Sequence, residues 1–109
     1  MPYDTHLAQR IRAALEGVPG LAEQKMFGGV GFTVNGNLAC GVQGDSLIVR
    51  LDPGRADEAL KLPAVRPFAM TGRPMKGWIF VGPEGIQAEA ELSGWVTAGV
   101  EFAGSLPAK

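Results

Sequence analysis

The chain has 109 residues, a formal net charge of −1 and a sequence pI of about 5.7. This length suits one domain with its own core, residues 1–109, and the nearly neutral charge argues against a protein that coats a polyanion such as DNA. The composition, with 46% hydrophobic and 19% charged residues, is that of a globular protein and not of a disordered one.

The first predicted element is an amphipathic helix over residues 4–16. Three large apolar residues recur every four positions and form one stripe: Leu7, Ile11 and Leu15. Asp4 or Thr5 can accept hydrogen bonds from the free backbone N–H groups of the first turn. We therefore expect this helix to pack with the stripe against a core.

Three strand-like runs follow, at residues 30–34, 38–43 and 47–51, each alternating large apolar residues with smaller or polar ones. Asn35-Gly36 separates the first two runs and is a strong signal for a tight hairpin turn. Short turns of this kind predict an antiparallel meander. The alternation also predicts that Leu38, Cys40 and Val42 share the apolar face, with the Cys40 thiol buried.

Pro53 can open a short second helix that runs to about Leu62. Its inward residues are expected to be Ala56, Ala59 and Leu60. Residues 78–81 predict a further strand and residues 68–70 another short one, with an irregular stretch between them.

The last segment has the clearest helical pattern. Its apolar residues follow a three-four spacing: Leu92, Trp95, Val96, Gly99, Phe102, Ala103 and Leu106. A glycine on the apolar stripe of a helix predicts a close approach to the sheet at Gly99. The alternative is that part of the stripe forms a dimer seam.

Taken together, these elements predict an α+β fold in which helices from both ends of the chain pack on an antiparallel meander. The expected order is helix, three strands, helix, two strands, helix. The single cysteine suits a reducing compartment, and the apolar runs are far shorter than the ~20 residues that span a bilayer. We therefore expect a cytoplasmic protein with no membrane contact.

No catalytic or metal-binding group of residues is recognisable. The glycine-rich run at residues 26–32 lacks the spacing of a dinucleotide or phosphate loop. His6 is the single histidine and Cys40 the single cysteine, which is a poor supply of zinc ligands or of a nucleophile–base pair. The acidic pairs Asp57-Glu58 and Glu89/Glu91 fit exposed helix faces. We expect no enzyme activity and no cofactor.

The segment GRPMKGW, residues 72–78, is the most distinctive candidate for binding. Cations and flat or soft apolar side chains are combined there and just before it: Arg66, Arg73, Met75, Lys76 and Trp78. Such a mixture could hold an anion, a peptide carboxylate or the acidic helix of a partner protein. The alternative is a structural loop whose methionine and tryptophan close the edge of the core.

Several of these motifs together resemble the N-terminal domain of the TfoX/Sxy family. The similarity begins with KMFGG at residues 25–29 and the Asn35-Gly36 turn, and continues with Arg66-Pro67-Phe68 and GRPMKGW. It ends with Gly94-Trp95-Val96 and the closing run at residues 102–107, so that it covers essentially the whole chain in order.

The resemblance implies a fold similar to secretion chaperones and kinship with regulators of natural competence, which act as non-enzymatic co-activators beside DNA-bound transcription factors. Those longer regulators carry a second, helical domain, which this sequence is not expected to include. The resemblance implies a protein partner and carries over no catalytic residue. One alternative is a small-molecule or anion-binding protein, or an enzyme, that uses the GRPMKGW segment. The chain could also form a homodimer. Direct nucleic-acid binding is not expected.

Overall fold

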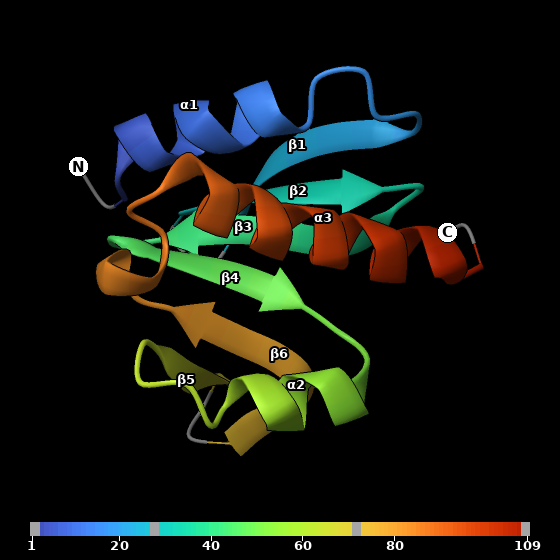
Figure 1. Cartoon of the computed structure of the whole chain (residues 1–109). Coiled ribbons are helices and arrows are strands. Elements are labelled where there is room, and N and C mark those ends of the chain that lie inside the picture. The colour runs from blue at the N-terminus through green and yellow to red at the C-terminus, as the bar shows by residue number, and fades with distance from the viewer. Residues whose placement is uncertain (1–2, 27–28, 71–72, 108–109) are drawn as a thin grey trace.

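A computed structural model of the chain describes residues 3–26, 29–70 and 73–107 (Figure 1). Its centre is an antiparallel six-stranded sheet in the order β1-β2-β3-β4-β6-β5. The strands are β1 (Leu21–Met26), β2 (Gly29–Val34), β3 (Asn37–Gln43), β4 (Ser46–Arg50), β5 (Val65–Met70) and β6 (Arg73–Val81). The helices are α1 (Thr5–Ala14), α2 (Pro53–Ala59), the 3-10 turn η1 (Pro83–Gly85) and α3 (Glu89–Ser105). This confirms the α+β class with an antiparallel sheet and a helix toward each end.

Within the described residues, α1, α2 and α3 all lie on one face of the sheet (Figure 1). Most of their buried residues form one cluster with inward residues of β2, β3, β4 and β6, and Ala103 of α3 packs in a smaller one with Val34 and Ala39. α3 crosses the middle of the sheet over β3 and β4, while α2 covers β6. Among the described residues no helix covers the opposite face, which makes that face a candidate surface for a site.

The first helix forms as its sequence pattern predicts. Asp4 is the N-cap, and its carboxylate accepts hydrogen bonds from the backbone N–H groups of His6 and Leu7 at 2.9 and 3.1 Å. The predicted stripe is buried: Leu7, Ile11 and Leu15. The Arg10 guanidinium then ties the helix to the segment before α3, through the Ile86 carbonyl at 2.8 Å and the Glu89 carboxylate at 2.7 Å. The first helix and the last are thereby joined at one end.

The hairpin between β2 and β3 also forms as expected, but β3 departs from simple alternation. Asn35 and Gly36 have φ values of 52° and 85°, as the tight turn requires. A register shift near Phe32 lets Phe32 pair with Cys40 while Thr33 pairs with Leu38. The extra residue of this bulge is Ala39, and it turns Leu38 to the helix-free face while Cys40 stays in the helix-covered core. The expectation that Leu38 and Cys40 share a face is therefore wrong.

The edge strand β1 was not among the expected strands. Its sequence, LAEQKM, lacks β-branched and aromatic residues, so intrinsic propensity does not favour a strand. It is held instead by antiparallel pairing with β2, from Leu21 opposite Val34 to Met26 opposite Gly29. The Glu23 carboxylate also receives two hydrogen bonds from Arg12 of α1, at 2.7 and 2.6 Å, which lower the pKa of Glu23. Tertiary partners have overridden local preference here.

β5 and β6 pair with each other antiparallel, so the expectation of an irregular stretch before residue 78 is wrong. β5 begins at Val65 and β6 already at Arg73, so the GRPMKGW segment is mostly strand. Pro67 is tolerated because β5 is the edge strand of the sheet, where a missing N–H donor costs little. Pro67, Pro74 and Gly77 within these two strands obscure the strand pattern in the sequence.

The buried face of α3 is narrower than its apolar stripe. Leu92, Val96, Gly99 and Ala103 face the sheet and are buried. Trp95, Phe102 and Leu106 are only half-buried, because these positions lie on the flank of the row that meets the sheet. Trp95, which the apolar stripe places against the sheet, packs on the edge of the core cluster while staying partly exposed, and it lines a pocket described below.

Cys40 is fully buried in β3, with none of its surface exposed, which confirms the expected core thiol. Burial raises the pKa of Cys40 to about 12, so at neutral pH the reactive thiolate is scarce. We predict that iodoacetamide labels Cys40 in the folded protein far more slowly than in urea, at a rate set by unfolding. Mass spectrometry over a time course checks this, and fast labelling of the native protein would show that the strand is exposed.

No helix in the described part of the chain is long and apolar enough to cross a membrane.

Candidate interaction surface

The helix-free face of the sheet carries its own apolar cluster, made only by strand residues. Leu38, Ile48 and Phe68 are buried there, with the half-buried rings of Trp78 and Phe80 packed against them. The Phe68 ring lies 5.5 Å from that of Trp78 and 4.8 Å from that of Phe80, centroid to centroid. These are distances at which aromatic rings attract one another beyond simple burial. The charged residues of this face lie over these packed rings, which form what we call the aromatic floor.

Arg66 lies over this floor. Its guanidinium carbon is 5.3 Å from the centroid of the Phe80 ring, which is a cation–π distance. One guanidinium nitrogen donates a hydrogen bond to the Ser46 hydroxyl at 3.2 Å. Among the described residues Arg66 forms no ion pair with a carboxylate. The group is thus oriented by a ring and a hydroxyl while its charge remains available.

Arg50 occupies the corresponding place at the end of β4. It pairs with Trp78 across the β4–β6 ladder, and its guanidinium carbon lies 5.5 Å from the Trp78 ring and 5.5 Å from the Phe102 ring of α3. In the part of the chain that the structure describes, no carboxylate neutralises it. We call Arg50, Arg66, Trp78 and Phe80 the arginine–aromatic face.

The backbone under Trp78 depends on a glycine. Gly77 has a φ of +83°, and a β-carbon built on it would lie 2.6 Å from the Leu51 carbonyl oxygen. The Gly77 carbonyl also accepts a hydrogen bond from the Leu51 N–H at 2.6 Å. No other residue fits this close contact with a left-handed backbone. Gly77 therefore fixes where Trp78 meets Arg50.

Of the five residues predicted from the GRPMKGW pattern, the structure brings Arg66 and Trp78 to this face. Arg73, Met75 and Lys76 belong to strand β6, but their side chains lie outside what the structure describes, as does Gly72 altogether. The loop expected around them is replaced by strand pairing between Ala69 and Pro74 and between Met70 and Arg73.

Arg50 and Phe80 were missed as site residues, although the sequence contained a signal for them. In β4 the arginine follows three apolar residues, and in β6 Trp78 and Phe80 are two positions apart and so face the same way. What the sequence could not give is that β4 and β6 are neighbours, since α2 and β5 separate them in the chain.

The other candidates from the sequence do not assemble. Cys40 is buried while His6 is exposed at the start of α1. Glu58 is exposed and paired with Lys61, and Glu89 is exposed and paired with Arg10. No group of three potential metal ligands occurs among residues 3–26, 29–70 and 73–107.

Comparison with known proteins gives one family. The model of the TfoX N-terminal domain matches residues 13–103 of the chain. No significant match was found among curated proteins or among solved structures.

Proposed function

We propose that this chain, which belongs to the TfoX N-terminal domain family, is a non-enzymatic regulatory domain that works by binding another protein. Membership suggests a regulatory or competence-related role, and the arginine–aromatic face is the surface that we assign to it. The observation that carries the assignment is the pair of guanidinium groups of Arg50 and Arg66, each placed over an aromatic ring without a carboxylate partner among the described residues.

The chemistry of this face selects an acidic partner. A guanidinium presents several N–H donors in one plane and binds carboxylates in pairs of hydrogen bonds. The half-buried rings of Trp78 and Phe80 add flat apolar area next to the charge, and arginine and tryptophan are enriched among residues that dominate binding energy. A helix or extended segment that carries glutamate or aspartate beside an apolar side chain would satisfy both.

We predict that a double variant, Arg50→Gln with Arg66→Gln, binds a glutamate-bearing amphipathic peptide at least tenfold more weakly than the parent protein. Each charge-assisted hydrogen bond is worth about 1.5–3 kcal/mol, and about 1.4 kcal/mol is a factor of ten. Calorimetric titration gives the affinities. Arg55→Gln, at an exposed arginine of the helix α2, is the control for the single variants Arg50→Gln and Arg66→Gln, because each of the three removes one positive charge.

The titration also separates the alternatives. Equal affinities of the double variant and the Arg55→Gln control would contradict the proposal. If acetate or phosphate bound as tightly as the peptide, a small-anion site would be the better description. Tight binding of random duplex DNA at physiological salt, with a steep salt dependence, would replace the protein partner with nucleic acid.

A further inference from the structure

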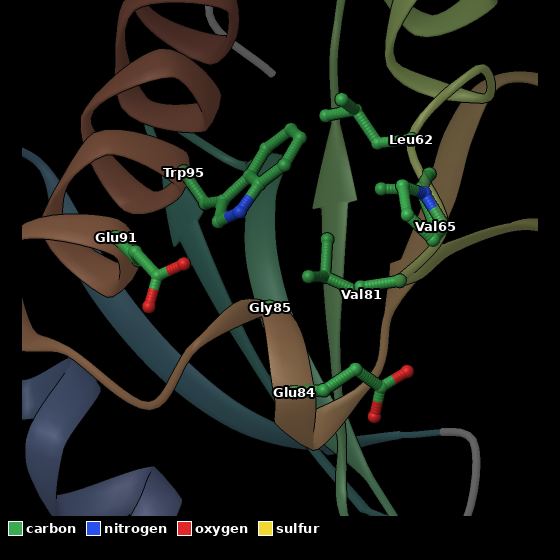
Figure 2. A pocket seen from close by; sticks show the side chains of 9 residues that line it. Leu62, Val65, Val81, Glu84, Gly85, Glu91 and Trp95 are labelled. Carbon is green, nitrogen blue, oxygen red and sulfur yellow. The ribbon is translucent and has the colours of Figure 1, made fainter.

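A hollow lies on the helix-covered side of the sheet, between the start of α3, η1 and the segment that joins α2 to β5. It encloses about 350 Å³, which is within the range of small-molecule sites. Figure 2 shows the Trp95 indole and Leu62 near one end, with Val65 and Val81 along the wall. Leu62, one of the lining residues, is 49% exposed. These residues offer an open, mostly apolar surface.

The charged groups around this pocket have one sign. Glu84 and Glu91 line it, on either side of Gly85 in Figure 2, and no lysine or arginine among the described residues does. Glu91 accepts a hydrogen bond from the Ala88 N–H at 3.0 Å through one of its oxygens. Glu84 has no ion pair within the described residues. The pocket therefore combines an aromatic ring, apolar walls and two carboxylates without a countercharge.

This combination favours a particular class of ligand. An aromatic face attracts a cation within about 6 Å of its centre, carboxylates add direct charge attraction, and the apolar walls favour a ligand whose charge is attached to hydrocarbon. A carboxylate ligand would be repelled, and a neutral one would gain nothing from the two glutamates. We propose that this pocket binds a small organic ammonium cation, with its apolar part against Leu62, Val65 and Val81. Its charge lies by the Trp95 ring and Glu91, and the exposed Glu84 adds charge attraction from the edge of the pocket.

The test uses choline and its neutral isostere 3,3-dimethylbutan-1-ol as a matched pair, and benzyltrimethylammonium as a larger cation. We predict that the cations shift the Trp95 indole N–H signal in a nitrogen–proton NMR spectrum, whereas the Trp78 signal on the opposite face of the sheet stays in place. The expected dissociation constant for benzyltrimethylammonium is about 1 mM, ordinary for a ligand of this size. The neutral alcohol should bind at least tenfold more weakly than choline.

The variants Glu84→Gln and Glu91→Gln, combined, should weaken the cations about tenfold and leave the alcohol unchanged. Glutamine at position 91 keeps an oxygen for the Ala88 N–H, so the start of α3 is preserved. Glu101→Gln on the exposed side of α3 removes a charge from the same helix as the control. The proposal is overturned if the alcohol binds as well as choline or if the Trp78 signal moves instead of the Trp95 signal. It is also overturned if no cation binds at a concentration of roughly ten times the expected dissociation constant. Tight binding of a lysine-bearing peptide without binding of the free cations would also overturn it.

Discussion

Replacing Gly99 with leucine should strongly destabilise the protein. A β-carbon built on Gly99 would lie 2.3 Å from the Ala39 carbonyl oxygen and 3.4 Å from a methyl carbon of Val49. The first of these atoms is backbone in a central strand, so it cannot move aside as a side chain could. Overpacking costs about 1–3 kcal/mol or more, out of a total stability of about 5–15 kcal/mol. We expect a loss of at least ~3 kcal/mol, measured by urea unfolding followed by circular dichroism.

A second glycine of the same helix provides the control. A β-carbon on Gly94 would meet nothing within 4 Å, so Gly94→Ala should raise stability by up to ~1 kcal/mol through helix propensity. Gly99→Ala should lower it, because even one methyl group enters the contact with Ala39. If the two alanine variants had equal stability, α3 would not approach the sheet as described. The alternative is that the apolar stripe of α3 is a dimer seam. Sedimentation of the parent protein and of Gly99→Leu tests this, because the variant would then be a folded monomer and the parent a dimer.

The close approach at Gly99 was predictable from the sequence, and comparison with other elements shows why. Gly99 lies within a long three-four apolar pattern, and a helix of seventeen residues is specified mostly by its own sequence. The Asn35-Gly36 turn is equally local, since both residues adopt the positive φ that the turn needs. Elements whose cause is local were predicted correctly.

Elements that form because of contacts with distant residues were not predicted from the sequence. β1 becomes a strand because β2 presents a free edge, and the bulge at Ala39 exists because β2 and β3 pair in two registers. The candidate face follows the same rule. Trp78 and Arg66 were noted for their chemistry, but Arg50 acquires its role only when β4 and β6 become neighbours. Spacing along the chain cannot reveal which strands lie side by side when a helix and a strand separate them.

Phe68→Ala should be the second large destabilisation, and it tests whether the helix-free face is a true core. The Phe68 side chain has no exposed surface although no helix in the described part of the chain covers that face. Removing a buried phenylalanine ring costs about 3–5 kcal/mol, from lost apolar burial and the cavity left behind. The ring contacts with Trp78 and Phe80 add to the loss. Urea unfolding of the variant gives the change in free energy.

Phe102→Ala is the matched control for this prediction. Phe102 is half-buried on α3, and the guanidinium of Arg50 lies over its ring. Phe102→Ala therefore removes the same ring from a more exposed site. It should lower the stability at most about half as much as Phe68→Ala. Phe68→Leu, which keeps most of the apolar volume, should recover most of the stability. Because Trp78 and Phe80 rest on the Phe68 ring, the alanine variant should also bind the acidic peptide more weakly, even under conditions where it remains folded. If the Phe68→Ala protein were as stable as Phe102→Ala, the aromatic cluster would be a solvent-exposed patch and not a core. Arg50 and Arg66 would then lack the packed aromatic rings that hold them in place, and the proposed interaction depends on those rings.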